Sequence, residues 1–363
     1  MSPLAPLPAD VVTLADHEAH ARTHLDANAW AYLDGVAADG LTHRANRAGW
    51  DRLRLQPRLL RPRPAPSTAT ELLGRRLPHP VLLAPLAYQR LFHADGEVAS
   101  ALAASAQEAG FVLSTLSSVR LETVAAAFRA DTQRGPLWFQ LYFQRDRGAT
   151  LELVRRAEQA GYEALVLTAD APVQGVRDAE RRVGFRLPAG VSAANLDATA
   201  LAQAPRSVGE LLAIAPDWSD LEWLVQATRL PVLLKGVLHP QDARDALAAG
   251  ARGLIVSNHG GRTLDGAAAT AEALPRIADR VAGAAPVLVD GGIRRGTDVL
   301  KAMARGASAV LVGRPFAWGL ATAGPVGVAH VLRLLRDELE AAMALSGVAD
   351  LARLPADLVL PQP

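Results

Sequence analysis

The stretch that decides the fold is Leu247-Ala248-Ala249-Gly250-Ala251-Arg252-Gly253-Leu254-Ile255-Val256-Ser257-Asn258-His259-Gly260-Gly261-Arg262. Its first part is the alanine-rich end of a helix, which Gly250 stops because glycine readily takes the left-handed conformation of a helix cap. Residues 253–256 are apolar throughout and indicate a strand that is buried on both faces. The polar turn that follows places His259 and Arg262 together where this strand ends.

The order of alanine-rich helix, glycine and short apolar strand recurs along the chain. With four further apolar runs it predicts eight strands, at residues 81–84, 111–113, 137–140, 164–167, 231–235, 253–256, 286–289 and 309–312. Strands that alternate with helices over about 250 residues are typical of an α/β protein with a closed (β/α)8 barrel, the TIM barrel. The alternative is an open doubly wound sheet, which usually carries a G-x-G-x-x-G fingerprint after its first strand. The sequence contains no such fingerprint, so we favour the barrel.

The segments outside the repeat predict the domain organisation. Residues 1–77 are expected to form an N-terminal helical extension with two amphipathic stretches and a plug for the barrel. The barrel itself is expected at 78–345 and a C-terminal tail at 346–363. The longest gap between strands follows strand 4, and its part at about 186–217 is expected to be a mobile loop over the rim.

The composition excludes several classes of protein. The chain has 363 residues, of which 50% are hydrophobic and 21% charged, as is ordinary for a soluble globular protein. A net charge of +1 gives no reason to expect nucleic acid or a membrane surface as a partner. The lack of cysteine excludes disulfides, thiolate metal sites and a thiol nucleophile. We expect no metal site. We also expect a cytoplasmic protein, because no apolar run approaches the ~20 residues of a membrane span and the N-terminus does not resemble a signal peptide.

The polar residues at the strand ends predict a site at the C-terminal rim of the barrel. His259 is suited to proton exchange near neutral pH, and Arg262 can bind a carboxylate through two parallel hydrogen bonds. Asp170, at the end of another strand, can orient the imidazole. A proton acceptor beside an anion-binding group indicates an enzyme that acts on a small organic acid.

A lysine and two glycine–arginine turns mark three further positions on this rim. Lys235 is one of only two lysines among 38 basic residues, so its place at a strand end indicates a need for a compact ammonium group. The turns at 290–296 and 313–315 follow the seventh and eighth strands, where barrels commonly bind phosphate. A phosphate-binding isomerase or aldolase, with Lys235 as a Schiff-base nucleophile, therefore stays an alternative.

The chain resembles the FMN-dependent 2-hydroxy acid oxidases and dehydrogenases from about Tyr32 to Ser346. This family includes glycolate oxidase, lactate oxidase, mandelate dehydrogenase and hydroxymandelate oxidase, and residues 84–97 are most similar to the hydroxymandelate oxidase branch. The most specific match is residues 257–262. Further matches are Phe139-Gln140-Leu141-Tyr142, Leu167-Thr168-Ala169-Asp170, Leu234-Lys235-Gly236, Asp290-Gly291-Gly292-Ile293-Arg294 and Gly313-Arg314-Pro315.

The resemblance implies a role for each matching position. His259 would be the catalytic base, paired with Asp170, and Lys235 would stabilise the anion that forms on the reduced flavin. The substrate would be bound by Arg262, Arg177, Tyr32 and Tyr142, and both tyrosines would also be catalytic. The cofactor-binding set would be Pro85, Leu86, Ala87, Ser117, Gln140, Thr168, Lys235, Ser257, Asp290, Gly292, Arg294, Gly313 and Arg314.

The implied activity is the oxidation of an L-2-hydroxy acid, such as glycolate, lactate or mandelate, to the 2-keto acid with FMN as cofactor. Reoxidation of the flavin by O2 would give hydrogen peroxide. The alternative is a soluble dehydrogenase that passes electrons to a quinone or another carrier, and hydride and carbanion mechanisms both stay open. A non-catalytic flavin binder would not need the full catalytic set that this chain carries. Family members are usually homotetramers or octamers, so a homo-oligomer is expected.

Two positions differ from the plant glycolate oxidases. Val119 stands where those enzymes carry a pocket tryptophan, and Leu86 stands where they carry a threonine. A smaller side chain at position 119 predicts room for a bulkier substrate, such as an aryl or long aliphatic hydroxy acid.

Overall fold

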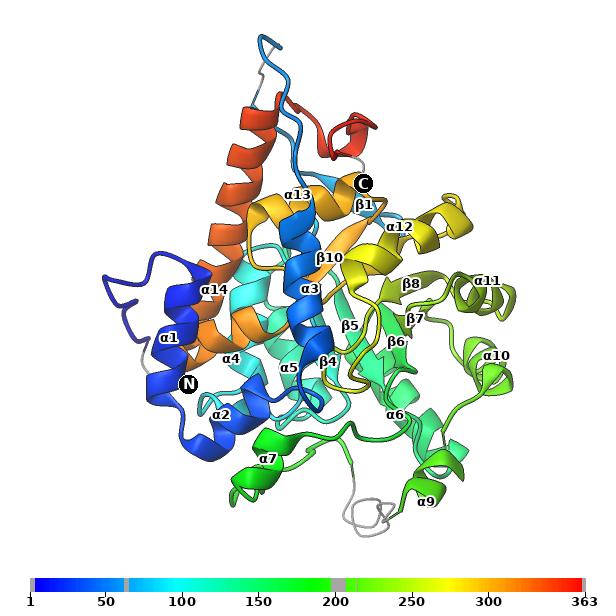
Figure 1. The fold of residues 1–363 in the computed structure, drawn as a ribbon. Coiled ribbons are helices and arrows are strands. Elements are labelled where there is room, and N and C mark those ends of the chain that lie inside the picture. Colours follow the sequence, from blue (N-terminus) through cyan, green and yellow to red (C-terminus); the bar gives the residue numbers. More distant parts are fainter. Residues whose placement is uncertain (1–3, 62–64, 197–206, 214, 361–363) are drawn as a thin grey trace.

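Eight parallel strands form a closed barrel in the computed structural model, which describes residues 4–61, 65–196, 207–213 and 215–360 (Figure 1). The strands pair in the order β10-β3-β4-β5-β6-β7-β8-β9. Their bounds are β3 (Val81–Leu83), β4 (Gly110–Ser114), β5 (Leu137–Leu141), β6 (Ala164–Thr168), β7 (Val232–Val237), β8 (Gly253–Val256), β9 (Val287–Val289) and β10 (Ala309–Val312). The (β/α)8 barrel expected from the sequence is confirmed, and the open sheet is wrong.

The side chains of each strand point alternately into two hydrophobic layers, one inside the barrel and one between the strands and the helices. Leu82 points into the barrel with the equivalent residues of the other strands, while Val81 and Leu83 pack outward against the helices. A helix of the outer layer lies between each strand and the next or follows the last one: α4 (Glu97–Ala106), α5 (Leu121–Phe128), α6 (Arg147–Ala160), α10 (Trp218–Ala227), α11 (Pro240–Ala248), α12 (Thr270–Val281), α13 (Gly296–Ala304) and α14 (Arg314–Ser346). The strands therefore need apolar residues on both faces, which explains the continuous apolar runs.

The glycines between helices and strands have two different functions. Gly161 ends α6 in the left-handed conformation, with φ at +85°, as expected. Gly110 does not cap α4, because the left-handed residue there is Glu108, with φ at +56°. Gly110 instead begins β4, where a Cβ atom would lie 2.5 Å from Cγ of Leu82. Close packing inside the barrel, rather than a helix cap, requires this glycine.

The N-terminal extension forms three helices rather than the two amphipathic stretches expected: α1 (Leu14–His24), α2 (Ala27–Asp34) and α3 (Leu41–Arg52). Helix α1 packs against α14, α3 packs against α12 and α2 contacts α7 (Asp178–Arg182) (Figure 1). The hairpin of β1 (Thr70–Leu72) and β2 (Arg75–Leu77) follows the extension. Leu72 and Leu77 belong to the cluster inside the barrel, so the hairpin is placed to close its N-terminal end.

Two segments complete the described chain. The connection between β6 and β7 holds α7, α9 (Val208–Ala213) and α10, and residues 197–206 and 214 of the expected mobile loop lie outside the described residues. The 3-10 helices η1 (Gln89–Leu91) and η2 (Leu351–Arg353) follow β3 and α14. After η2 the chain returns to the extension, where Val359 pairs with Leu55.

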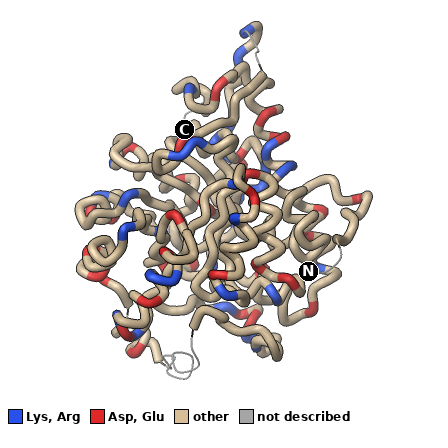
Figure 2. Tube along the Cα trace, turned by 180° about the vertical axis from the view of Figure 1, so that it is seen from behind, with Lys and Arg blue, Asp and Glu red and all other residues tan. Residues whose placement is uncertain are grey.

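Charged residues of both signs are interspersed over the molecule (Figure 2). Among the helices of the described residues, none combines the length and the apolar character that crossing a membrane requires. The described part of the chain also holds no group of three or more His, Asp or Glu residues arranged to bind a metal ion.

His79, which lies just before β3, predicts a measurable acid sensitivity of the fold. Its Nε2 lies 2.9 Å from the carbonyl oxygen of Gln107, and its Nδ1 accepts a hydrogen bond from the amide of Val81. These bonds hold the neutral imidazole, and burial lowers the pKa of His79 to about 4 from 6.5. Because the unfolded chain binds this proton more readily, the stabilisation is complete above pH 6.5 and is lost as the pH falls toward 4.

We therefore expect His79→Gln to flatten the pH dependence of stability. Urea unfolding at pH 7 and pH 4 measures the effect: the difference in unfolding free energy between wild type and variant should narrow by on the order of 3 kcal/mol. A difference that stays constant with pH would show that His79 does not titrate as the structure implies.

Candidate active site

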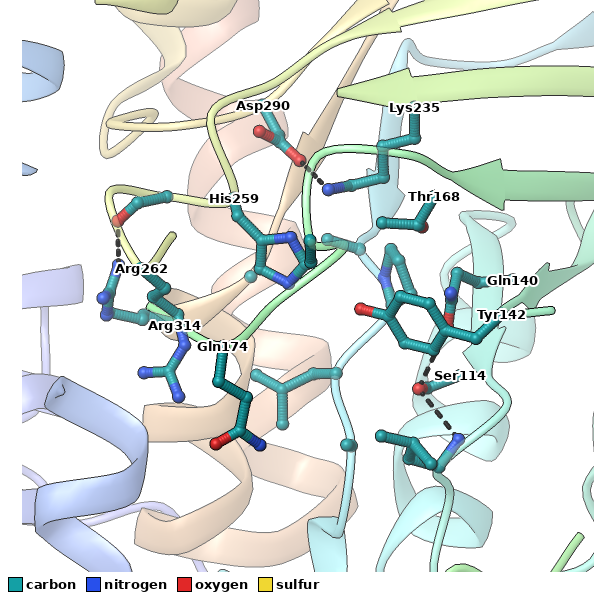
Figure 3. Close-up of a pocket in the computed structure, with 18 of the residues that line it drawn as sticks. Ser114, Gln140, Tyr142, Thr168, Gln174, Lys235, His259, Arg262, Asp290 and Arg314 are labelled. Carbon is teal, nitrogen blue, oxygen red and sulfur yellow. Dashed lines mark hydrogen bonds and ion pairs between the residues drawn. The ribbon is translucent and has the colours of Figure 1, made fainter. Parts of the chain in front are cut away.

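A cavity of about 610 Å³ lies at the C-terminal ends of the barrel strands. Residues near or just after the C-terminal ends of all eight strands line it, together with residues of α2 and of the connection after β6. Figure 3 shows His259, Lys235, Gln140 and Tyr142 around the same space. The volume lies within the roughly 300–1,000 Å³ that is usual for ligand and cofactor sites.

His259 and Asp170 form a hydrogen-bonded pair on one side of this cavity. The Nδ1 atom of His259 lies 2.9 Å from Oδ1 of Asp170. A carboxylate can only accept, so Nδ1 donates the hydrogen bond and Nε2 is left to accept a proton. Burial opposes the charge on Asp170, but Lys235 and His259 outweigh it and hold the pKa of this carboxyl below its ordinary value. The ionised carboxylate can then stabilise the imidazolium that forms when Nε2 takes a proton.

The backbone around His259 explains the pair of glycines that follows it. His259 takes a left-handed conformation, with φ at +57°, and its amide donates to Oγ of Ser257. A Cβ atom at Gly261 would lie 2.7 Å from the amide nitrogen of His43. The tight turn and the close approach of the N-terminal extension therefore both restrict the sequence here.

Lys235 is a buried cation between two polar partners. Its Nζ donates to Oγ of Ser257 at 2.9 Å and lies 3.4 Å from Oδ2 of Asp290. Burial works against the ammonium, but Asp290 and Asp170 outweigh it and raise the pKa of Lys235 above its ordinary value. The lysine therefore stays protonated, and a protonated amine is not a nucleophile, which disfavours the Schiff-base alternative. One of its three N–H groups is left for a ligand.

Several of the buried side-chain polar atoms without a partner among the described residues belong to this same part of the cavity lining. Of the nine such atoms, the three beside Lys235 are Nε2 of Gln140, Oγ1 of Thr168 and Oδ1 of Asp290, and Nε of Arg177 is a fourth in the cavity lining. Unsatisfied buried polar atoms are rare and costly in native proteins. These donors and acceptors, which lack a hydrogen-bond partner in the protein, match a flat ligand whose edge carries several polar atoms.

Arg262 and Arg177 form a cationic end of the cavity beside Tyr32. Nη1 of Arg262 donates to the carbonyl oxygens of Tyr32 and Gly35, at 2.8 and 2.6 Å. Its guanidinium carbon lies 5.2 Å from the centre of the Tyr32 ring. Burial raises the pKa values of Tyr32 and Tyr142, so both phenols keep their proton and can donate to an anion.

Arg294 and Arg314 form a second cationic region at the end of β9 and the start of α14. Arg314 donates to the carbonyls of Gly260, Leu33 and Gly35, and Arg294 lies 4.6 Å from the ring centre of Trp318. Burial, with repulsion from neighbouring arginines, lowers the pKa of Arg314 to about 9. Burial likewise lowers the pKa of Arg294 to about 10. Two half-buried guanidinium groups near helix N-termini favour a bound phosphate.

Helix α2 positions both cationic regions. Its last carbonyl groups have no partner within the helix, and they accept hydrogen bonds from Arg262 and Arg314. The negative end of a helix dipole also attracts cations. The N-terminal extension thus completes the site rather than only covering the barrel.

Helix α3 holds two of the rim loops in place. The side chains of Asn46 and Asn258 exchange two hydrogen bonds of 2.8 Å, which fixes the loop that carries His259. Trp50 and Arg47 donate to the carbonyls of Gly291 and Gly292 in the next loop. These contacts couple the loop after β8 to the loop after β9.

Most of the site residues expected from the sequence line the cavity. They are Tyr32, Pro85, Leu86, Ala87, Gln140, Tyr142, Thr168, Arg177, Lys235, His259, Arg262, Asp290, Gly292, Arg294, Gly313 and Arg314. Asp170 and Ser257 lie behind this surface, where they bond to His259 and Lys235. The structure thus brings together residues that the sequence separates by more than two hundred positions.

Two residues that follow β4, Ser117 of this set and Val119, lie outside the cavity lining. The hydroxyl of Ser117 donates to the carbonyl of Val119 and accepts from Asn195, and Ser117 is not among the residues that line the cavity. Ser114, at the end of β4, lines the cavity instead. Val119 is 7% exposed and packs in the hydrophobic core, so it gives no reason to expect a bulkier substrate.

Several lining residues are not apparent from the motifs. Tyr88, Gln174, Glu180 and Phe185 lie on the side of the cavity near Arg177 and Tyr32. Only Glu180 has a sequence signal, because it follows Arg177 by three residues in a short helix and such residues face each other.

Comparisons with known proteins agree with this geometry. A family described as FMN-dependent dehydrogenase matches residues 21–361. An L-lactate oxidase from Nostoc sp. is 47% identical over 94% of this chain and 95% of its own length. A 4-hydroxymandelate oxidase from Amycolatopsis orientalis is 48% identical over 93% of this chain and 94% of its own. A solved structure of mandelate oxidase with benzoyl-formic acid is 46% identical, has a TM-score of 0.86, and covers 94% of this chain and 96% of that chain.

Proposed function

The chain belongs to the family of FMN-dependent dehydrogenases, and on that premise we infer that it oxidises an L-2-hydroxy acid to the 2-keto acid with dioxygen as electron acceptor. The observation that carries this is the His259–Asp170 pair in one cavity with Arg262 and Arg177. Relatives at 47–48% identity are named oxidases, so a dehydrogenase that uses another carrier is not favoured.

The residues of the cavity fit FMN. Gln140, Thr168 and Lys235 offer polar atoms to the edge of a flavin ring, and Arg294 and Arg314 offer charge to its phosphate. When bound, FMN supplies a two-electron acceptor that dioxygen can reoxidise to give hydrogen peroxide.

The protein groups bind the substrate and move its proton. Arg262 and Arg177 would bind the carboxylate, and the protonated phenols of Tyr32 and Tyr142 would donate hydrogen bonds to the substrate oxygens. Nε2 of His259 would accept a proton from the substrate, and Asp170 would stabilise the resulting imidazolium. Hydride and carbanion routes both begin from this arrangement.

The cavity wall favours an apolar, and in particular an aryl, side chain on the substrate. The rings of Tyr32 and Phe185 stack with centres 5.0 Å apart, and the ring of Tyr88 lies 6.0 Å from that of Tyr32. Together with Leu86, Phe143 and Leu187, these rings give the cavity an apolar lining against which an aryl group can pack. We therefore propose mandelate-like acids as good substrates, with lactate as the smaller competitor.

The activity is tested on the purified protein with a panel of hydroxy acids. We expect flavin absorbance, bleaching by (S)-mandelate or L-lactate without oxygen, and hydrogen peroxide when oxygen is admitted. The R enantiomers are the matched controls and should bleach the flavin far more slowly. A protein that binds no flavin, or a flavin that no 2-hydroxy acid bleaches, contradicts the proposal.

The cytoplasmic location and the assembly of four or eight copies stay predictions. The chain alone has a mass of 38.3 kDa, so light scattering on the eluted protein distinguishes a tetramer from an octamer.

A further inference from the structure

Among the described residues that line the cavity, Glu180 is the acidic side chain that pairs with Arg262 and Arg177. Its Oε1 atom lies 3.2 Å from Nη1 of Arg177 and 3.2 Å from Nη2 of Arg262. The side chain of Glu180 is 13% exposed, and each arginine side chain is 15% exposed. A single carboxylate oxygen thus bridges both guanidinium groups in a largely buried setting.

Two neighbouring contacts hold this bridge in place. The backbone oxygen of Glu180 accepts a hydrogen bond of 2.8 Å from Phe185, which fixes the end of α7. A Cβ atom at Gly35 would lie 3.3 Å from Oε1 of Glu180 and 3.5 Å from Nη1 of Arg262. The bridge is therefore built between α7 and the end of α2, with little space to spare.

From this bridge we propose that Glu180 sets the charge of the carboxylate-binding end, so that the cavity accepts monocarboxylate hydroxy acids and discriminates against dicarboxylate ones. The inference rests on the proposed function and narrows its substrate class. Glu180 acts through the two arginines, so it is a specificity-determining residue and not a base.

Charge counting gives the physical reason. Two guanidinium groups and one carboxylate leave a net charge of about +1, which one substrate carboxylate neutralises. Among the nearby charges, Lys235 pairs with Asp290 and His259 with Asp170. Arg314 shares the carbonyl of Gly35 with Arg262, and the phosphate of the cofactor would neutralise its charge. A second substrate carboxylate would therefore enter a poorly hydrated cavity without a counter-charge, which is costly.

The electrostatics of Arg262 agree with this role. Burial and repulsion from Arg177 lower the pKa of the Arg262 guanidinium, whereas Tyr32 and Glu180 act in the opposite direction. Glu180 thus stabilises two like charges that would otherwise repel each other at close range.

The test compares the binding of two 2-keto acids of similar length to the FMN-loaded protein. The dicarboxylate is 2-oxoglutarate and the monocarboxylate is 2-oxohexanoate, and calorimetry gives both dissociation constants without turnover. For wild type we expect the monocarboxylate to bind at least ~10-fold more tightly. Glu180→Gln keeps the shape of the side chain and removes its charge. The dissociation constant of 2-oxoglutarate should therefore fall by on the order of 10- to 100-fold, and that of 2-oxohexanoate should fall less.

Two further variants make the result decisive. Asp178→Asn removes a charge on the same helix at a side chain that is 42% exposed, and it should leave the ratio of the two dissociation constants unchanged. Glu180→Asp keeps the charge and should keep the wild-type preference. If Glu180→Gln weakens both ligands equally, the residue is only structural and the inference is wrong.

The inference and the proposed function fail in different ways. A wild-type protein that prefers 2-oxoglutarate overturns the role of Glu180, even if Glu180→Gln does not fold. Failure of the same wild-type preparation to oxidise any L-2-hydroxy acid overturns the proposed function instead.

Discussion

His259→Ala should lower kcat by roughly 10²- to 10⁴-fold while the protein still binds its flavin. The imidazole is the one cavity group that is held by a carboxylate at 2.9 Å and presents a second nitrogen as a proton acceptor. Its side chain makes no other hydrogen bond among the described residues, so its removal leaves the loop contacts of Asn258 in place. Alanine adopts the left-handed backbone of residue 259 less readily than histidine does, so we also expect a small loss of stability.

Stopped-flow bleaching of the flavin without oxygen measures this effect, together with the ratio of flavin to protein. The control is His24→Ala, which removes an exposed histidine on α1 and should keep the wild-type rate. Added imidazole should restore part of the activity of His259→Ala, because the vacated space connects to the cavity. Bleaching at the wild-type rate would exclude His259 as the base.

Lys235→Met should destabilise the protein by about 3–5 kcal/mol and should also slow reduction of the flavin. Lys235 is 3% exposed, and its ammonium is the ion-pair partner of Asp290. Oδ1 of Asp290 already has no partner among the described residues, so loss of the lysine leaves a buried carboxylate without compensation. The flavin would also lose the positive charge that favours negative charge on its ring.

The chain provides a matched control in its second lysine. Lys301 is 9% exposed, donates to the carbonyl of Trp50 and lies 4.0 Å from Asp298. Asp298 keeps its ion pair with Arg47, at 2.6 Å, when Lys301 is replaced. Lys301→Met should therefore lower the free energy of unfolding by only about 1 kcal/mol, the contribution of one hydrogen bond. It should leave the rate of flavin reduction unchanged. If urea unfolding shows that both variants lose the same free energy of unfolding, the Lys235–Asp290 pair has no special role.

The sequence predicted the barrel well because each strand carries its own signal. A strand that is covered on both faces must be apolar along its whole length, and this holds for β8 without reference to any other strand. The rim residues could be predicted for the same reason, since the end of a strand fixes where the following side chain emerges. Ser117 is harder to place from the sequence because it lies three residues beyond β4, where the local turn and the bond to Val119, rather than the strand, hold its side chain.

The sequence alone could not predict the contacts of Glu180 and of the end of α2. Spacing pairs Glu180 with Arg177, but only the folded chain places Arg262 against the same oxygen. The carbonyl groups that hold Arg262 and Arg314 carry no side-chain signature at all. Contacts of this kind depend on how a separate helix docks on the barrel.

The sequence by itself determined the eight-stranded barrel, the cationic and basic side chains on its rim, and the kind of ligand they suit. These features follow from local patterns, in which hydrophobic periodicity and turn residues act over a few positions. Only the tertiary structure decided which oxygen balances the charge of the two arginines and which serine faces the cavity. Those outcomes depend on distances between segments far apart in the chain, and such distances are fixed only when the helices pack.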